Sequence, residues 1–86
     1  MSVICIMLHP ERDKSHQLAG ALINHLEASG HSVRLDNAES SMVGRAELGC
    51  SEETLANGAD LAVSIGGDGT MLRTFERVAE FGVPVL

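Results

Sequence analysis

The segment Gly66-Gly67-Asp68-Gly69-Thr70 places three glycines around one carboxylate, directly after an apolar run. Glycine has no Cβ, so its backbone can adopt positive φ and a ligand can approach it closely. A stretch with helical periodicity follows near Thr70, and the first turn of a helix offers N–H groups and a partial positive charge that suit phosphate. The same field favours ionised Asp68, whose carboxylate could accept a proton from an attacking hydroxyl. The segment therefore predicts a phosphate-binding loop that carries a base.

Two structural alternatives explain the same loop without a ligand. Asp68-Gly69 is a hairpin signal, but a hairpin needs a second strand, and residues 71–81 have helical periodicity instead. Asp68 or Thr70 could also simply cap the following helix, although a cap needs one glycine and this loop has three. The dinucleotide fingerprint and the Walker A pattern are both absent, so a nucleotide would be held in another way.

Apolar runs predict the strands that position this loop. Residues 3–8 and 60–65 have the pattern of strands buried on both faces, and residues 83–86 begin another such strand. The alternation at residues 31–36 indicates a second, less buried strand. Residues 37–50 are small and polar without a sustained period, and we interpret them as a loop.

Helical patterns fill the gaps between the strands. After a predicted turn at residues 10–14, a first helix shows one apolar face and stops at Gly30. Ser51 is expected to cap a short helix that has acidic residues in its first turn, and Gly82 to end the last helix. The apolar positions of the first helix are Leu18, Ala19, Leu22, Ile23 and Leu26, and those of the last are Met71, Leu72, Phe75, Val78 and Ala79.

This alternation of strands and helices predicts an α/β fold, a three-layer Rossmann-like parallel sheet with about four strands. Ligands of such sheets bind beyond the carboxyl ends of the strands. The glycine loop follows the predicted strand 60–65, and His9 follows strand 3–8, so both are expected at this edge. His9 could border the nucleotide there, but we interpret it as a solvated or capping residue without a catalytic role.

Composition restricts the classes of partner. The 86 residues carry a formal charge of −6 with six scattered Lys and Arg, which argues against nucleic acid or an anionic membrane surface. The sequence has no apolar run of about 18 residues, and its apolar start lacks the basic region of a signal peptide. Cys5 and Cys50 are too few for a disulfide framework. These features predict a cytoplasmic protein.

The last residues, Val83 to Leu86, have a pattern typical of the beginning of a buried strand. A chain that ended there would place its terminal carboxylate inside a sheet, where an unpaired charge is costly. We therefore expect residues 1–86 to be the N-terminal nucleotide-binding part of a longer protein.

The loop and its continuation resemble the signature of the NAD kinase family. Gly-Gly-Asp-Gly-Thr is shared by a superfamily that also includes 6-phosphofructokinases and diacylglycerol and sphingosine kinases. The continuation Met71-Leu72-Arg73, followed by a helix and residues 83–86, is most similar to NAD kinases. The Asn-Glu-Val-like continuation of the lipid kinases is missing.

The resemblance implies phosphoryl transfer from ATP or polyphosphate to the 2′-hydroxyl of the adenosine ribose of NAD. By this match Asp68 is the proton acceptor, and Asp68 and Gly69 contact NAD. Mg²⁺ would arrive with the phosphates, because the sequence shows no metal-ligand cluster. Gly66, Gly67 and Thr70 would line the phosphate side, and Arg73 would reach the nucleotide unless it is a plain surface arginine.

Parts of the family pattern are absent from this sequence. The Asn-Glu or Asn-Asp pair that holds NAD and the C-terminal β-rich domain would lie beyond Leu86, so we expect the 86 residues alone to be inactive. The resemblance also implies a homo-oligomer for the full-length protein. A lipid kinase of the diacylglycerol type and a non-catalytic flavodoxin-like binding domain, with Asp68 as a cap, stay open as alternatives.

Overall fold

The computed structural model describes residues 2–9 and 13–86, and for Asp13 and Asp68 it describes the backbone alone. β1 (Val3–Leu8) lies in the middle of the sheet, and its six apolar residues are almost all buried. The other elements follow as α1 (Asp13–Ala28), β2 (Ser32–Asp36), α2 (Asn37–Met42), a 3₁₀ turn η1 (Ala46–Leu48), β3 (Gly49–Cys50), α3 (Glu52–Leu55), β4 (Leu61–Ile65), α4 (Asp68–Val78) and a second 3₁₀ turn η2 (Ala79–Phe81).

Within the described residues the sheet has four strands in the order β3-β2-β1-β4, and every pairing is parallel. Ile4 is paired with Val33 of β2 on one side and with Leu61 of β4 on the other. The predicted strand at residues 83–86 is reduced to a single parallel bridge between Ala62 and Val85. The predicted parallel α/β fold is confirmed. From the central strand β1, the sheet extends through β2 to β3 on one side and to β4 on the other.

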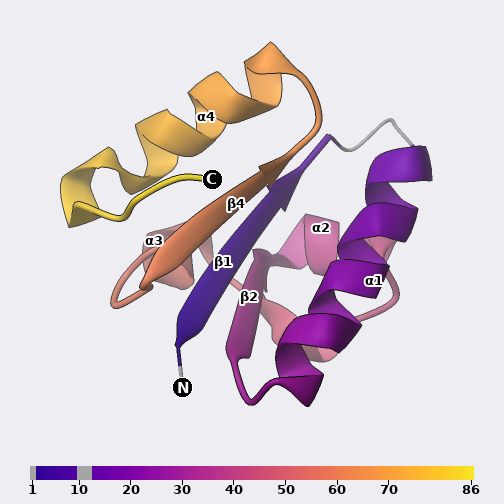
Figure 1. Ribbon diagram of the computed structural model, residues 1–86. Coiled ribbons are helices and arrows are strands. Elements are labelled where there is room, and N and C mark those ends of the chain that lie inside the picture. The colour runs from indigo at the N-terminus through magenta and orange to yellow at the C-terminus, as the bar shows by residue number, and fades with distance from the viewer. Residues whose placement is uncertain (1, 10–12) are drawn as a thin grey trace.

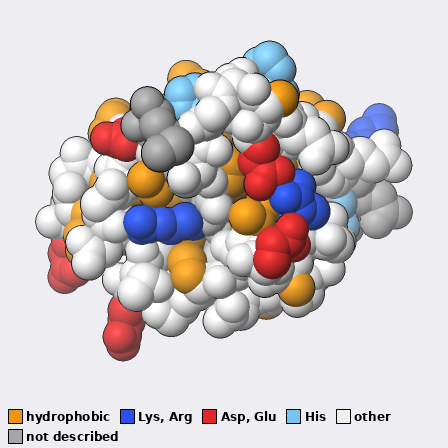
Figure 2. Space-filling model, turned by 90° about the horizontal axis from the view of Figure 1, so that it is seen from below, with side chains coloured by type: hydrophobic (Ala, Val, Ile, Leu, Met, Phe, Trp, Pro, Cys, Tyr) orange, Lys and Arg blue, Asp and Glu red, His pale blue; other side chains and the backbone are white. Residues whose placement is uncertain are grey.

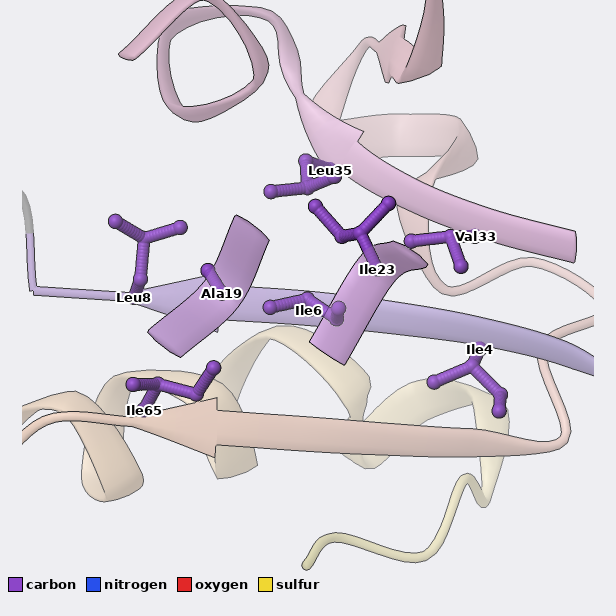
Figure 3. Packing of buried hydrophobic residues seen from close by; sticks show 8 residues of the cluster. All are labelled: Ile4, Ile6, Leu8, Ala19, Ile23, Val33, Leu35 and Ile65. Atoms are coloured by element: carbon purple, nitrogen blue, oxygen red, sulfur yellow. The ribbon is translucent and has the colours of Figure 1, made fainter. Parts of the chain in front are cut away.

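Helices cover both faces of the sheet and make three layers (Figure 1). Alternate residues of β1 explain this arrangement, because Ile4, Ile6 and Leu8 face α1 while Cys5 and Met7 face the layer of α3 and α4. Figure 3 shows the first of these two cores, with Ala19 and Ile23 of α1 set over the sheet. The second core consists of Cys5, Met7, Leu55, Ala56, Ala62, Val78 and Val83.

The prediction of a loop at residues 37–50 is wrong, because this segment contains α2, η1 and β3. α2 begins where an Asp36 side-chain oxygen accepts a hydrogen bond from the Glu39 backbone N–H at 2.7 Å, which is an N-cap. The six residues of α2 bury Glu39 and Ser40 rather than an apolar stripe. A helix this short with a polar buried face has no hydrophobic period to detect.

The boundaries of the other helices largely follow the predictions. Gly30 after α1 and Gly82 after η2 both have positive φ, +86° and +64°. Ser51 occupies the N-cap position of α3, as expected. The predicted turn at residues 10–14 falls partly on residues 10–12, which lie outside the described residues, and α1 already begins at Asp13.

α4 differs from its prediction at its start and on its buried face. It begins at Asp68 with Gly67 as N-cap, not near Thr70. Its most buried residues are Thr70, Thr74 and Val78, whereas Leu72 and Phe75 are 64% and 51% exposed. The hydroxyl of Thr74 donates to the Thr70 carbonyl at 2.7 Å, so a polar side chain is accommodated against β4. In α1, Leu18 is likewise exposed rather than part of the core.

Candidate functional site

The carboxyl ends of β1 and β4 meet at one edge of the sheet. Leu8 is paired with Ile65, and the His9 N–H donates to the Ile65 carbonyl at 3.0 Å. The strand order reverses between these two strands, which is where doubly wound sheets open a crevice for ligands. His9 and the glycine loop therefore lie together at this edge, as predicted.

Gly66 has a structural reason to be glycine. Its φ is +151°, a value that residues with a Cβ rarely adopt. A Cβ built on it would lie 2.6 Å from the Thr70 Oγ1 and 3.1 Å from the His9 Cβ. Gly66 thus allows β4 to pass closely between His9 and the first turn of α4.

Gly67 and Gly69 have no such reason. Apart from the neighbouring residues and the backbone of α4 itself, no described atom lies within 4 Å of a Cβ built on either residue. Both belong to the N-terminus of α4, where the backbone N–H groups of Gly67, Asp68 and Gly69 have no acceptor inside the helix. The loop therefore presents free space beside amides that the helix itself does not pair, at the positive end of a helix dipole.

Asp68 is the first residue of α4, so its backbone starts at the edge of this space. Its side chain is outside the described part of the structure, and the proton-acceptor role stays a prediction. Thr70 is only 5% exposed and lies under Gly66, and its N–H donates to the Gly67 carbonyl at 3.1 Å. The N-cap position belongs to Gly67, so Thr70 is not the N-cap residue of α4. A capping role for the Asp68 side chain stays a prediction.

Arg73 extends from α4 to the end of β1. Its Nη2 donates to the Leu8 carbonyl at 3.0 Å and lies 4.0 Å from a carboxylate oxygen of Glu39. Its side chain is 37% exposed, yet the Nε atom is buried without a hydrogen-bond partner among the described atoms. Arg73 is consequently anchored at the site rather than free on the surface, and its contact with a nucleotide stays a prediction.

A buried carboxylate, Glu39, and its half-buried neighbour Asp36 lie beside Arg73, and sequence reasoning missed this pair. Glu39 is 4% exposed, and its Oε1 accepts the Leu8 N–H at 2.6 Å. Burial, and then the neighbouring Asp36, raise the pKa of Glu39 to about 7, although the Leu8 N–H and Arg73 lower it. Burial also tends to raise the pKa of Asp36, but hydrogen bonds with Glu39 and Arg77 outweigh it and hold that pKa below its usual value.

Arg77 connects these carboxylates one turn further along α4. Its Nη1 lies 3.3 Å from Asp36 and 3.7 Å from Glu39, and its Nη2 lies 2.6 Å from Glu52 of α3. One signal in the sequence could have revealed the pair, because Asp36 and Glu39 have the spacing of a capping box. The capping half of that motif forms, but the Glu39 side chain turns to β1 instead of its own helix start.

Other kinds of site find no support in the described part of the chain. Its His, Cys, Asp and Glu side chains form no group of three or more that could hold a metal ion. None of its helices is both long and apolar enough to cross a membrane. At the amino ends of the strands, on the face seen in Figure 2, the basic side chains are scattered, some of them beside acidic ones, and they form no broad basic surface.

The parallel sheet, the reversal of strand order and the glycine loop at that point define a doubly wound α/β domain with a ligand site at its switch point. The family model of the ATP-NAD kinase N-terminal domain matches residues 4–86. The chain therefore belongs to the ATP-NAD kinase family.

Individual relatives agree with this assignment. The NAD kinase of Symbiobacterium thermophilum is 33% identical over the whole chain, and that of Wolinella succinogenes is 30% identical over the whole chain. The NAD kinase of Azoarcus sp. is 41% identical over 77% of the chain. The chain spans 30%, 29% and 23% of the lengths of these three relatives, respectively.

Proposed function

We propose that the protein containing this chain is an NAD kinase. The 2′-hydroxyl oxygen of the adenosine ribose of NAD would attack the terminal phosphorus of the donor. The bond from that phosphorus to the rest of the donor would break, and Asp68 would take the hydroxyl proton. Of the three hypotheses that the sequence left open, the family match favours this one over a lipid kinase or a non-catalytic binding domain.

The observation that carries the proposal is the open space over Gly67 and Gly69. The fold does not need glycine at either position, because an added Cβ would meet no described atom. A ligand that packs against the backbone would need it, since any side chain there would fill the ligand's place. The unpaired amides at the start of α4 make a phosphate-bearing ligand the natural occupant.

Each loop residue receives a role in this proposal. Asp68 and Gly69 contact NAD, while Gly66 and Gly67 line the phosphate side with Thr70 supporting Gly66 from below. Arg73 contributes positive charge to the nucleotide from the anchored position that it holds against Leu8. Mg²⁺ would enter with the donor phosphates and supply charge neutralisation there, because Mg²⁺ commonly binds through phosphates and few carboxylates.

The remaining properties of the full-length protein are also proposals. We infer a cytoplasmic enzyme that uses ATP or polyphosphate and assembles as a homo-oligomer. A C-terminal β-rich domain would supply the rest of the NAD pocket. These inferences rest on family membership and on the relatives' greater length.

The direct test is Asp68→Asn in the full-length protein, with NADP formation as the assay. The change keeps the size of the side chain and removes the base, so we expect kcat to fall roughly 10²–10⁴-fold while NAD still binds. Asp60→Asn is the matched control, because Asp60 lies at the opposite end of β4 and its side chain accepts the Val3 N–H at 2.7 Å, which Asn can also do.

Near-normal turnover in Asp68→Asn would contradict the proton-acceptor role. A wild-type protein that binds NAD but forms no NADP with ATP or polyphosphate would contradict the proposed reaction itself. Equal losses in Asp68→Asn and Asp60→Asn would indicate a general effect on folding instead of a catalytic one.

A further inference from the structure

Glu39 contacts the site through the backbone of Leu8, whose N–H and carbonyl group are both held by side chains. The Leu8 N–H donates to Glu39 at 2.6 Å, and the Leu8 carbonyl accepts from Arg73 at 3.0 Å. Leu8 is the last residue of β1 and pairs with Ile65, immediately before the glycine loop. Glu39 and Arg73 therefore hold the two successive peptide groups on either side of Leu8, and these fix the strand end against which the loop is built.

The next contacts lead from Leu8 to the loop itself. The His9 N–H donates to the Ile65 carbonyl, and the His9 Cβ lies where a Cβ on Gly66 would touch it. Arg73 belongs to the helix whose first turn forms the loop. A change at Glu39 thus reaches the loop by two short routes, along β1 and through α4.

The negative charge of Glu39 has an effect that is separate from its hydrogen bond with Leu8. A neutral acid or an amide could still accept the Leu8 N–H, but only the ionised carboxylate attracts the Arg73 and Arg77 guanidinium groups, at 4.0 and 3.7 Å. In a buried setting such attraction is screened less than at the surface.

We propose that Glu39 is a positioning residue of the proposed kinase, whose ionised carboxylate holds the Leu8 N–H and Arg73 in the orientation that the loop 66–70 needs for turnover. This inference rests on the proposed function for its kinetic consequence and on the Leu8 contacts for its structural one. Glu39 lies on α2, outside the glycine motif, and touches no substrate in this scheme.

Protonation of Glu39 gives the proposal a measurable pH dependence. With its pKa raised to about 7, Glu39 is neutral in mildly acidic solution and ionised above neutrality, so turnover should rise with pH through this range. The groups around it that carry charge or titrate are Asp36 from β2, Arg73 and Arg77 from α4, Glu52 from α3 through Arg77, and His9 next to Leu8 on β1.

The kinetic test compares Glu39→Gln with wild type in the full-length protein between pH 6 and pH 8.5. Gln keeps the acceptor for Leu8 and removes the charge, so we expect kcat at pH 8 to fall roughly tenfold and to lose the rise near pH 7. Glu47→Gln is the matched control, because Glu47 is 62% exposed and pairs with Arg45 on η1. A loss of folded protein alone would lower activity equally at every pH.

A second measurement does not depend on kinase activity. In amide NMR spectra of the same proteins, Leu8 and the loop residues 66–70 should titrate together near pH 7 in wild type and Glu47→Gln, and not in Glu39→Gln. His9→Gln should keep this titration. If the protein proved not to be a kinase, this result would still support the structural link from Glu39 to the loop.

Two results would overturn the proposal. The first is a loop whose amides do not respond to pH near 7, or respond equally in Glu39→Gln. The second is a pH dependence of kcat that disappears in His9→Gln and persists in Glu39→Gln, because it would then belong to the imidazole.

Discussion

At the residue scale, Gly66 and Gly69 are glycines for different reasons, and this difference can be measured. Gly66→Ala should destabilise the fold by roughly 1–3 kcal/mol, because it forces a Cβ toward Thr70 at a φ that alanine rarely adopts. Gly69→Ala should leave stability unchanged or raise it by up to about 1 kcal/mol, because Gly69 lies in a helix with open space around it.

For enzyme kinetics we expect Gly69, which the fold does not need, to matter for binding of NAD. Gly69→Ala is expected to raise the KM for NAD in the full-length protein although the fold is intact, since the methyl group occupies the ligand's space. Urea unfolding of Gly66→Ala and Gly69→Ala measures the change in stability, and steady-state kinetics of both variants measures the change in KM. A Gly69→Ala protein with normal kinetics would contradict the assignment of this space to a ligand.

The residues of the glycine loop could be recognised from sequence because their types are unusual at a strand end. The burial of Glu39 could not, since the capping-box spacing with Asp36 indicates only an exposed acid at a helix start. Its burial arises from Leu8, 31 residues earlier, and from arginines on α4. Sequence spacing within one element carries no information about such contacts between elements.

At the element scale, α4 shows which side chains hold the site helix on the sheet. Val78 is 1% exposed and packs in the core with Met7 and Ala62, whereas Leu72 is 64% exposed. We expect Val78→Ala to cost roughly 2 kcal/mol and Leu72→Ala less than about 0.5 kcal/mol. Urea unfolding of both variants measures the difference, and equal effects would contradict this packing.

The sequence periodicity of α4 placed Leu72 and Phe75 on the buried face, but both side chains are exposed. It correctly indicated a helix, because apolar residues recur at helical spacing, but it could not choose the buried face. The buried face uses Thr70 and Thr74, whose small side chains lie close to the sheet and whose hydroxyls pattern arguments count as polar. α2 was missed for a related reason, since its buried residues are polar.

At the scale of the whole molecule, the chain holds one half of the proposed site. The described residues form the sheet edge, the loop and Arg73, but the chain spans only 30% of the length of its S. thermophilum relative. We expect the purified 86-residue chain to form no NADP under conditions in which the full-length protein does. Detecting NADP above a no-protein blank, and its loss in Asp68→Asn, would contradict this expectation.

The overall architecture was predictable because strands buried on both faces and alternating with helices allow few topologies. The strand order was not, since the two-residue β3 and the single bridge at Val85 leave no pattern of their own.

The central position of β1 also bears on how the chain is made. Ile4 of β1 pairs with Val33 of β2, about 29 residues later, but on the other edge its partner is Leu61 of β4, about 57 residues later. During synthesis this apolar strand therefore emerges long before its second neighbour, and its unpaired edge can join another nascent chain. Because the loop 66–70 directly follows β4, the proposed phosphate-binding edge is completed only when β4 pairs with β1.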